Sequence, residues 1–322
     1  MITNSIIAHG DQLGAQMTTL ANLLFLAKEN NQDLCFYKEF KNFRRRFLIL
    51  ENFNIYNQMC GEIQIKFTRR LFLPIPELYC LQFREHKKIK SIANYKRIYK
   101  AKFQNFLDMC FYRGCRLFYR DFKMVREKND VHCAQSLLKL ESNKNYDIQS
   151  GFGTYQDWKK YNDLISNFFQ FKNEIVHQGN LIYNSLNTQK PTVAVHFRKG
   201  DYLILSSLNL TLDYYKKALE LFDKDKFELV IFSDDIESCK NTGIFDGYII
   251  HYMDAHSAGV DMYVMSLCDN NIIANSSFSF WGAYLNKNKD KKVVCPHDFI
   301  GPTAKDYLYM NGNWYPETWI AL

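Results

Sequence analysis

Hydrophobic and polar positions at the start of the chain predict a strand, a turn and a helix, in that order. An apolar run at residues 5–8 is followed by the polar stretch HGDQLG at 9–14. Apolar side chains then recur at helical spacing, at Leu20, Leu23, Leu24 and Ala27. A further strand is expected at 33–37. A strand, a glycine-containing loop, a helix and a strand form the opening of an α/β domain.

The middle of the chain has a less regular pattern. Residues 99–119 carry apolar positions at roughly helical spacing between basic ones, which favours helix there. The polar stretch at 184–191 ends in proline and predicts a junction between domains. We therefore expect an N-terminal domain at 1–185 and a C-terminal domain at 186–322, each with its own core.

The second half alternates clearly between strand and helix patterns. Strands are predicted at 192–197, 228–232, 248–252, 272–274 and 292–295, and helices at 213–222, 261–268 and 280–285. This alternation predicts a parallel, doubly wound sheet, in which ligands bind at the carboxyl ends of the strands. Polar residues follow three of those ends, as the pairs Arg198 and Asp201, Asp234 and Asp235, and Ser276 and Ser277.

Composition is that of a folded protein and bears on its location. Apolar residues make up 47% of the 322 residues and charged residues 23%, which is typical of a globular chain. The nine cysteines form no CxxC pair and no zinc-type spacing with histidines, so we expect reduced thiols and no structural zinc. Residues 1–14 lack a basic stretch before an apolar one, and no apolar run approaches the roughly 20 residues that span a bilayer. We expect a soluble, cytoplasmic protein.

Positive charge is concentrated in one stretch of the chain. The formal net charge is +7, and residues 84–128 hold fourteen Lys or Arg against four acidic residues. Such a run is usually a solvated helix face. It would also suit an anionic membrane surface or an acidic partner, so peripheral contact with the inner face of the membrane is a second interpretation.

The most distinctive stretch of the second half is HFRKGDY, which begins at His196. Residues two apart on a strand face the same side, so His196 and Arg198 are expected to point together at the strand's end. An arginine keeps its charge and can hold phosphate oxygens through two parallel hydrogen bonds, which suits a departing diphosphate. A structural ion pair between Arg198 and Asp201 would explain the same residues.

A second cluster is the stretch NSSF, which follows a predicted buried strand and opens a helix. Free backbone amides at a helix start, together with serine hydroxyls, form an anion site. A serine at that position can also simply cap the helix. Two anion-directed sequences at one sheet edge favour phosphate binding more than either does alone.

Acidic residues at the same edge have more than one interpretation. Asp234 and Asp235 would suit a divalent metal, but hard metals need several oxygen ligands and no other acidic cluster lies nearby. Contact with a nucleotide is therefore favoured over metal binding. Asp261, at the start of the next predicted helix, would accept from guanine N–H groups or cap that helix.

Together, HFRKGDY, the FSDD strand end, DMYVMSLCDNNIIANSSFSFWGAYLN and the closing YPETWI resemble the bacterial α-1,2-fucosyltransferases. That family shares its donor site with protein O-fucosyltransferases and α-1,6-fucosyltransferases. The resemblance covers residues 192–322 closely and implies two Rossmann-like domains that face each other across a cleft, the GT-B type of glycosyltransferase. The N-terminal domain would supply the acceptor surface and the C-terminal domain the GDP site.

The resemblance also implies roles for individual residues. Arg198 would bind the β-phosphate of GDP-fucose, His196 would lie against the nucleotide, and Asp261 would bind guanine. The phosphate loop would be formed by Ser276, Ser277 and Phe278. Further donor contacts are expected at Gln12, Gly14, Gln16, Asp201, Asp234 and Asn275. Residues 12–16 read QLGAQ where the family usually has GLGNQ, so Ala15 stands in place of an amide side chain.

The implied reaction transfers L-fucose from GDP-β-L-fucose to a galactose-type hydroxyl, with inversion and an α-1,2 linkage, in synthesis of bacterial surface glycans such as O-antigen. Its partners would be GDP-fucose and a galactose-containing oligosaccharide, with no nucleic acid. Arg198 and the helix start at Ser277 would stabilise the phosphate charge, so neither a metal nor another cofactor is expected. Asp11, in the first loop, is the candidate general base, and a turn-shaping role would explain it equally well.

Two alternatives remain open. One is transfer of a different GDP-linked deoxyhexose. The other is a basic nucleic-acid-binding protein that uses residues 84–128, which would show steep salt dependence and no affinity for GDP. A dehydrogenase and a P-loop enzyme are disfavoured, because neither GxGxxG after the first strand nor GxxxxGK[ST] occurs.

Overall fold

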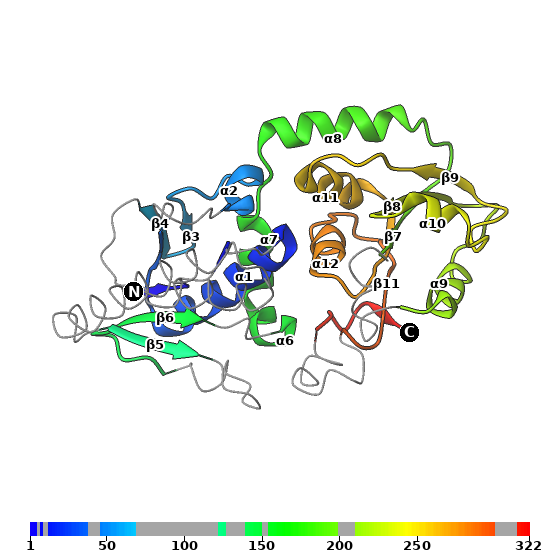
Figure 1. The fold of residues 1–322 in the computed structure, drawn as a ribbon. Coiled ribbons are helices and arrows are strands. Elements are labelled where there is room, and N and C mark those ends of the chain that lie inside the picture. The colour runs from blue at the N-terminus through cyan, green and yellow to red at the C-terminus, as the bar shows by residue number, and fades with distance from the viewer. Residues whose placement is uncertain are drawn as a thin grey trace, which may run out of the picture.

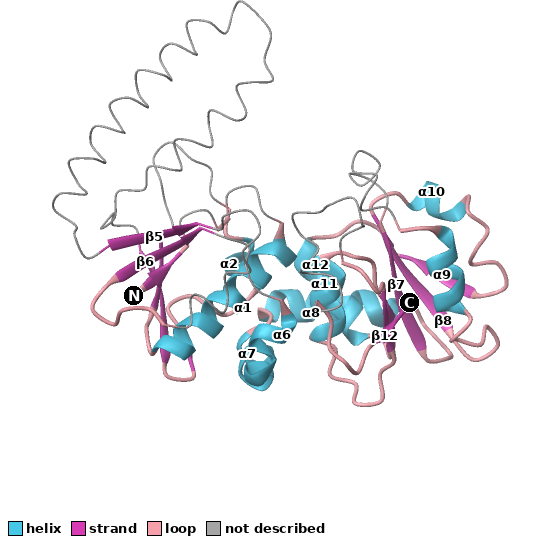
Figure 2. Cartoon of the chain, turned by 90° about the horizontal axis from the view of Figure 1, so that it is seen from below, coloured by secondary structure: helices cyan, strands magenta, loops and turns pink. Residues whose placement is uncertain are grey.

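Two six-stranded sheets form the outer parts of the molecule, with α1, α8, α11 and α12 between them (Figure 1 and Figure 2). This arrangement comes from a computed structural model of the chain. The residues that it describes are 1–4, 7–8, 12–37, 46–68, 122–126, 139–149, 154–198, 210–299 and 314–322.

The N-terminal sheet has the strand order β3-β4-β2-β1-β6-β5, and its neighbouring strands are parallel except for β3 and β4. Its strands are β1 (Ile2–Thr3), β2 (Leu34–Tyr37), β3 (Met59–Cys60), β4 (Ile63–Thr68), β5 (Phe122–Arg126) and β6 (Asn145–Gln149). The predicted strand at 33–37 is confirmed by β2, whereas residues 7 and 8, the described part of the strand predicted at 5–8, lie in a turn. The first strand ends at Thr3, because the Asn4 side-chain oxygen accepts a hydrogen bond from Ile7 N at 2.6 Å and turns the chain.

The described helices of the N-terminal half gather around α1, which packs on this sheet. They are α1 (Leu13–Asn30), α2 (Leu48–Asn52), α6 (Tyr155–Trp158), a short 3₁₀ turn (Lys159–Tyr161) and α7 (Asn162–Phe168). The helix predicted from apolar spacing is confirmed by α1. Most of its side chains are buried around the whole helix, so α1 has protein on every side.

The C-terminal sheet has the order β12-β11-β10-β7-β8-β9, and all its strands are parallel. Its strands are β7 (Thr192–Phe197), β8 (Glu228–Ser233), β9 (Ile249–Tyr252), β10 (Asn270–Ile272), β11 (Val293–Cys295) and β12 (Ile320–Ala321), and its helices are α9 (Leu212–Leu219), α10 (Ile236–Lys240), α11 (Ala258–Leu267) and α12 (Ser277–Tyr284). The prediction of a parallel, doubly wound sheet is confirmed. The strand order reverses between β7 and β10, which makes that position the switch point of the sheet.

Helix α8 (Asn173–Ser185) starts near the middle of the molecule and extends over the C-terminal half, above α11, in Figure 1. It lies within the predicted N-terminal domain of residues 1–185, yet it packs against α11 of the C-terminal half. Ile175, Ile182 and Tyr183 cover the cluster around α11. A side chain at Gly179 would collide with the ring of Tyr263, so the two helices cross closely there.

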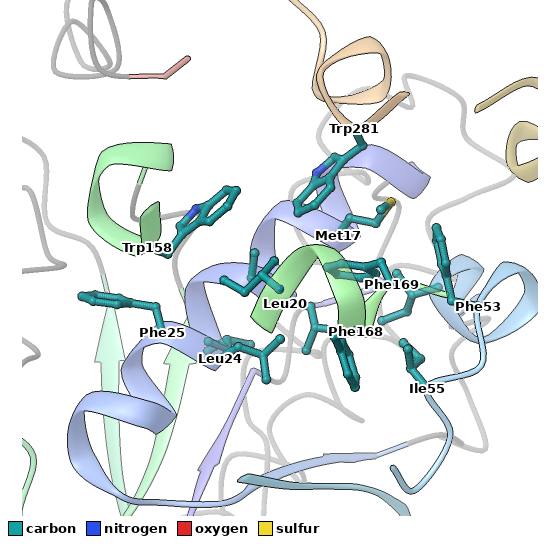
Figure 3. Packing of buried hydrophobic residues seen from close by; sticks show 14 of the residues in the cluster. Met17, Leu20, Leu24, Phe25, Phe53, Ile55, Trp158, Phe168, Phe169 and Trp281 are labelled. Carbon is teal, nitrogen blue, oxygen red and sulfur yellow. The ribbon is translucent and has the colours of Figure 1, made fainter. Parts of the chain in front are cut away.

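The largest hydrophobic cluster takes residues from both halves, while the buried residues of two further clusters all belong to the C-terminal half. Met17, Leu20 and Leu24 of α1 belong to the same cluster as Trp281 of α12 (Figure 3). The indoles of Trp158 and Trp281 stack with their centroids 5.8 Å apart and their planes within 2°. Because α1 is apolar on both faces, it packs on its own sheet and on α12 at once.

Several sequence predictions fall on residues outside the described ranges. The helix expected at 99–119 is among them, and of the basic stretch at 84–128 only the backbone of β5 is described. Within the described part, the cysteines are buried free thiols, at Cys35, Cys60, Cys239, Cys268 and Cys295. None of the described helices combines the length and apolarity of a bilayer-spanning helix.

Candidate functional site

A cavity of about 330 Å³ lies where the carboxyl ends of β7, β8 and β9 meet the starts of α1, α11 and α12. This volume falls within the range of roughly 300–1,000 Å³ of small-molecule sites. The strand ends contribute His196 and Arg198, then Ser233 and Asp234, and then the segment from Met253 to His256. The cavity therefore opens beside the switch point, where a doubly wound sheet is expected to bind its ligand.

His196 and Arg198 both line the cavity, as the two-residue strand period predicted. The His196 side chain is almost fully buried, and its ring lies 5.6 Å from that of Phe278. Burial, helped by the charge of Arg198 and opposed by Asp234, lowers the pKa of His196 to about 3. His196 is therefore neutral near pH 7, and its buried Nδ1 has no hydrogen-bond partner among the described residues.

The neighbouring carboxylates Asp234 and Asp235 have different surroundings. Asp234 lines the cavity. Asp235 caps α10 instead, because its side chain accepts hydrogen bonds from Ser238 N at 3.0 Å and Ser238 Oγ at 2.5 Å. Among the described residues, no group of three or more His, Cys, Asp or Glu side chains is placed to hold a metal ion. Asp235 is therefore engaged in the helix cap, and only Asp234 of the two carboxylates lines the cavity.

Asp261 faces the cavity from the first turn of α11. The cap of that helix is Ser257, whose hydroxyl accepts from Val260 N at 3.3 Å. Asp261 is therefore not the cap, which was the alternative interpretation of its position. His256 Nδ1 lies 3.1 Å from Asp261 Oδ1. Burial raises the pKa of Asp261, and the contact with His256 opposes that rise.

Sequence reasoning missed His256 and Asp254 as cavity residues. Both follow β9 at the carboxyl edge of the sheet. The signal that could have found them is the rule already applied to the other strands, namely that polar residues after a parallel strand lie at the ligand edge.

The NSSF stretch serves mainly to begin α12. Ser276 is buried, and its hydroxyl accepts from Phe278 N at 3.3 Å, which is the capping role that the sequence left open. Phe278 lines the cavity, whereas Asn275, Ser276 and Ser277 are not among the lining residues. Of the predicted phosphate loop, Phe278 at the start of α12 is thus the residue that lines the cavity.

The first turn of α1 brings the N-terminal half to the same cavity. Gln12 and Leu13 line it. The structure does not bring Gln16 there, because its buried amide donates to Arg46 O at 2.9 Å and accepts from Ile49 N at 3.4 Å. Gly14 is also buried away from the cavity, against the start of α12. Gln16 and Gly14 are thus not among the residues that line the cavity, and their expected contacts with the donor stay predictions.

Asp11 and Asp201 lie outside the described residues, so their roles remain predictions.

The electrostatic character of the cavity follows from its helices. The starts of α1, α11 and α12 all contribute lining residues, so the positive ends of these helix dipoles lie around it. Arg198 adds a full positive charge at the end of β7. Asp234, Asp254 and Asp261 also line the cavity and add negative charge, so an anionic group such as a diphosphate is favoured specifically beside Arg198 and the helix starts.

Residues 5–315 match the family model described as "Glycosyl transferase family 11". The chain belongs to glycosyl transferase family 11. The resemblance to fucosyltransferases inferred from HFRKGDY and the NSSF stretch is thereby confirmed at the level of the family. Membership of this transferase family also favours an enzyme over the nucleic-acid-binding alternative.

Two curated relatives of this family 11 chain come from Escherichia coli. The chain is 31% identical over 196 residues to "O-antigen biosynthesis glycosyltransferase WbnK", covering 57% of this chain and 63% of that one. It is 39% identical over 123 residues to "Alpha-1,2-colitosyltransferase", covering 35% of this chain and 40% of that one. In both cases, less than two thirds of the relative's own length is matched.

Solved structures with the same fold include POFUT1. The crystal structure of POFUT1 in complex with GDP-fucose aligns with a TM-score of 0.51 and 14% identity, covering 90% of this chain and 95% of that one. The complex of POFUT1 with GDP gives the same TM-score at 11% identity, covering 91% and 98%. Identities this low show the fold alone, and they confirm the predicted GT-B-type arrangement of two α/β units.

Proposed function

We propose that this family 11 member transfers L-fucose from GDP-β-L-fucose to a galactose-type hydroxyl and forms an α-1,2 linkage with inversion. The observation that carries the proposal is the cavity beside β7, in which Arg198 and three helix starts surround a place for a diphosphate. The sequence resemblance and the curated relative named for O-antigen biosynthesis support the choice of sugar and pathway.

The nucleotide would be recognised at the side of Asp261. A carboxylate can accept hydrogen bonds from two neighbouring N–H groups, and guanine presents such donors whereas uracil lacks the pair. His256 holds one oxygen of Asp261 at 3.1 Å and so fixes the orientation of the carboxylate. The neutral ring of His196, which is among the lining residues, would lie against the nucleotide.

The transfer itself would depend on charge stabilisation. As the bond between the fucosyl carbon and the phosphate oxygen breaks, negative charge grows on the departing GDP. Arg198 and the helix starts meet this charge without rearranging, and no metal is required. The acceptor oxygen attacks the opposite face of the same carbon, and its proton passes to a base, for which Asp11 is the candidate.

The acceptor would be a galactose-containing glycan of the bacterial surface, as in O-antigen. We place the enzyme in the cytoplasm, with the basic stretch at 84–128 making peripheral contact with the inner face of the membrane. An excess of basic side chains near an anionic lipid surface favours such contact by about 1 kcal/mol for each Lys or Arg.

A second candidate is transfer of another GDP-linked deoxyhexose by the same cavity. It is favoured by the relative named as an α-1,2-colitosyltransferase, which has the higher identity over its matched length. The diphosphate and guanine contacts would be the same, and the difference would lie at the sugar. Ala15, where the family usually has an amide side chain, is the residue that motivates this alternative.

One experiment separates these candidates. The purified protein is incubated with GDP-fucose and, in parallel, with GDP-colitose, each against a panel of galactosides. Transfer of fucose adds one fucosyl unit to the acceptor mass, and NMR of the product gives the linkage. Transfer from GDP-colitose alone would replace the fucosyl proposal with the second candidate, and transfer from neither donor to any galactoside would contradict both.

A further inference from the structure

The starts of α1 and α12 approach each other more closely than side chains allow. A Cβ atom added at Gly14 would lie 2.5 Å from Phe278 N and 2.6 Å from Ser277 C. These distances are shorter than the roughly 3.0 Å that real Cβ atoms tolerate, and the atoms concerned belong to the backbone, which cannot move aside as a flexible side chain could. Only glycine permits this approach, so backbone from the two halves of the molecule is in direct contact at this point.

A buried hydrogen-bonded chain fixes the contact from the side. The Trp281 indole Nε1 of α12 donates to Thr18 Oγ1 of α1 at 3.0 Å. Thr18 Oγ1 in turn donates to Gly14 O at 3.0 Å. The Trp281 ring is held by its stack on Trp158. One hydroxyl thus connects an indole of the C-terminal half to the carbonyl of the glycine that touches α12.

This contact lies directly behind the donor cavity. Leu13, which lines the cavity, precedes Gly14, and Phe278, which also lines it, is the residue that Gly14 touches. Movement of the first turn of α1 would therefore move one wall relative to the other. An apolar core packs around the pair, with Met17 and Leu20 in the same cluster as Trp281 (Figure 3).

We propose that Thr18 and Gly14 are positioning residues that hold Leu13 against Phe278, so that the donor cavity is assembled across both halves before a ligand binds. The proposal rests on the proposed function only in naming GDP-fucose as the ligand. Thr18 has no place in the cavity lining and acts through Gly14 and Trp281.

The test compares Thr18→Val with Thr18→Ser and with a matched control, Thr192→Val. Valine keeps the shape of threonine but removes the hydroxyl that both accepts and donates. Thr192, at the start of β7, is also buried, and its hydroxyl likewise donates to Asp269 Oδ2 at 3.0 Å and accepts from Asp269 N at 3.1 Å. It lies roughly 16 Å along the strand from the cavity end.

Both valine variants are expected to unfold at a lower temperature than the wild type, because each leaves buried polar partners unpaired. Only Thr18→Val is expected to raise the dissociation constant and KM for GDP-fucose, by about tenfold or more, since small misplacements of a binding wall are costly. Thr18→Ser should restore both values. Equal binding by Thr18→Val and Thr192→Val would overturn the proposal.

Exchange of hydrogen for deuterium in the wild type supplies a second test that needs no variant. The Trp281 indole N–H and the amides of residues 15–18 are expected to be protected without ligand, and equally so with GDP. Protection that appears only with GDP would contradict preassembly. If the wild type failed to bind GDP-fucose, the proposed function would be wrong. The exchange measured without ligand would still test whether Thr18 and Gly14 hold the two halves together.

Discussion

The two walls of the cavity differ in how they contribute to the site. The C-terminal wall supplies charge and hydrogen-bonding groups, with Arg198, Asp234 and Asp261 placed after parallel strands or at a helix start. The N-terminal wall supplies Gln12 and Leu13 and no charged side chain from the described residues. Among the described lining residues, the charged groups thus come from one half, while the other half completes the shape. Variants in the first wall should alter affinity and turnover directly, and those in the second should act through position.

The largest effect is expected at Arg198. Arg198→Ala should lower kcat by on the order of 10²–10³, because one preorganised donor to a developing anion is lost. Arg198→Lys should not rescue, since a point charge cannot reproduce the two parallel hydrogen bonds of the guanidinium. Steady-state turnover of GDP-fucose measures both. Turnover equal to that of the wild type in Arg198→Ala would contradict the role of Arg198 in stabilising the departing diphosphate.

Next in size is nucleotide selectivity at Asp261. GDP should raise the unfolding temperature of the wild type while UDP should not. Asp261→Asn should weaken GDP binding about tenfold to a hundredfold, which corresponds to losing hydrogen bonds to a charged group. Calorimetric titration with GDP and UDP measures the change. A UDP response as large as that of GDP would contradict the guanine assignment.

The same carboxylate predicts a dependence on pH. Burial raises the pKa of Asp261, and guanine binding requires its ionised form, so GDP affinity should fall on acidification at a pH above the ordinary aspartate value. The effect on stability has the opposite sign. Because the pKa of Asp261 is higher in the folded state than in the unfolded state, its contribution to the free energy of unfolding is present at low pH and decreases as the pH rises past the pKa of the unfolded state. The pH dependence of GDP binding should disappear in Asp261→Asn, and its persistence there would assign it to another group.

A smaller effect on turnover is expected at Asp11, the candidate base. Asp11→Asn should lower kcat by about tenfold or less, under the roughly 10²–10⁴ typical of general bases, because a cation-like transition state needs little proton removal. Turnover at several pH values measures this. A loss as large as that of Arg198→Ala would make proton abstraction the main barrier.

The smallest effects separate Asp235 from metal chemistry. Asp235→Ala should cost about 1 kcal/mol of stability through the lost helix cap and leave kcat unchanged. Activity should also persist in excess EDTA. Loss of activity in EDTA that Mn²⁺ or Mg²⁺ restores would transfer charge stabilisation to a metal and contradict the proposed role of Arg198.

The sequence by itself determined the elements of the C-terminal half and the wall that they carry. Strand β7 was predicted with its observed bounds, and the two-residue period placed His196 and Arg198 on one side of its end. These inferences succeeded because a buried parallel strand is recognisable from its own continuous apolar run, and because the carboxyl ends of such strands lie at one edge of the sheet.

Only the tertiary structure decided how the two halves meet. It placed Gly14 against α12, directed the Gln16 amide to Arg46 and Ile49, and packed α12 into the same cluster as α1. The bond between Thr18 and Trp281 joins residues 263 positions apart. The local pattern of apolar and polar residues cannot predict such a contact, because the contact depends on how distant helices pack and not on the conformational preference of either helix.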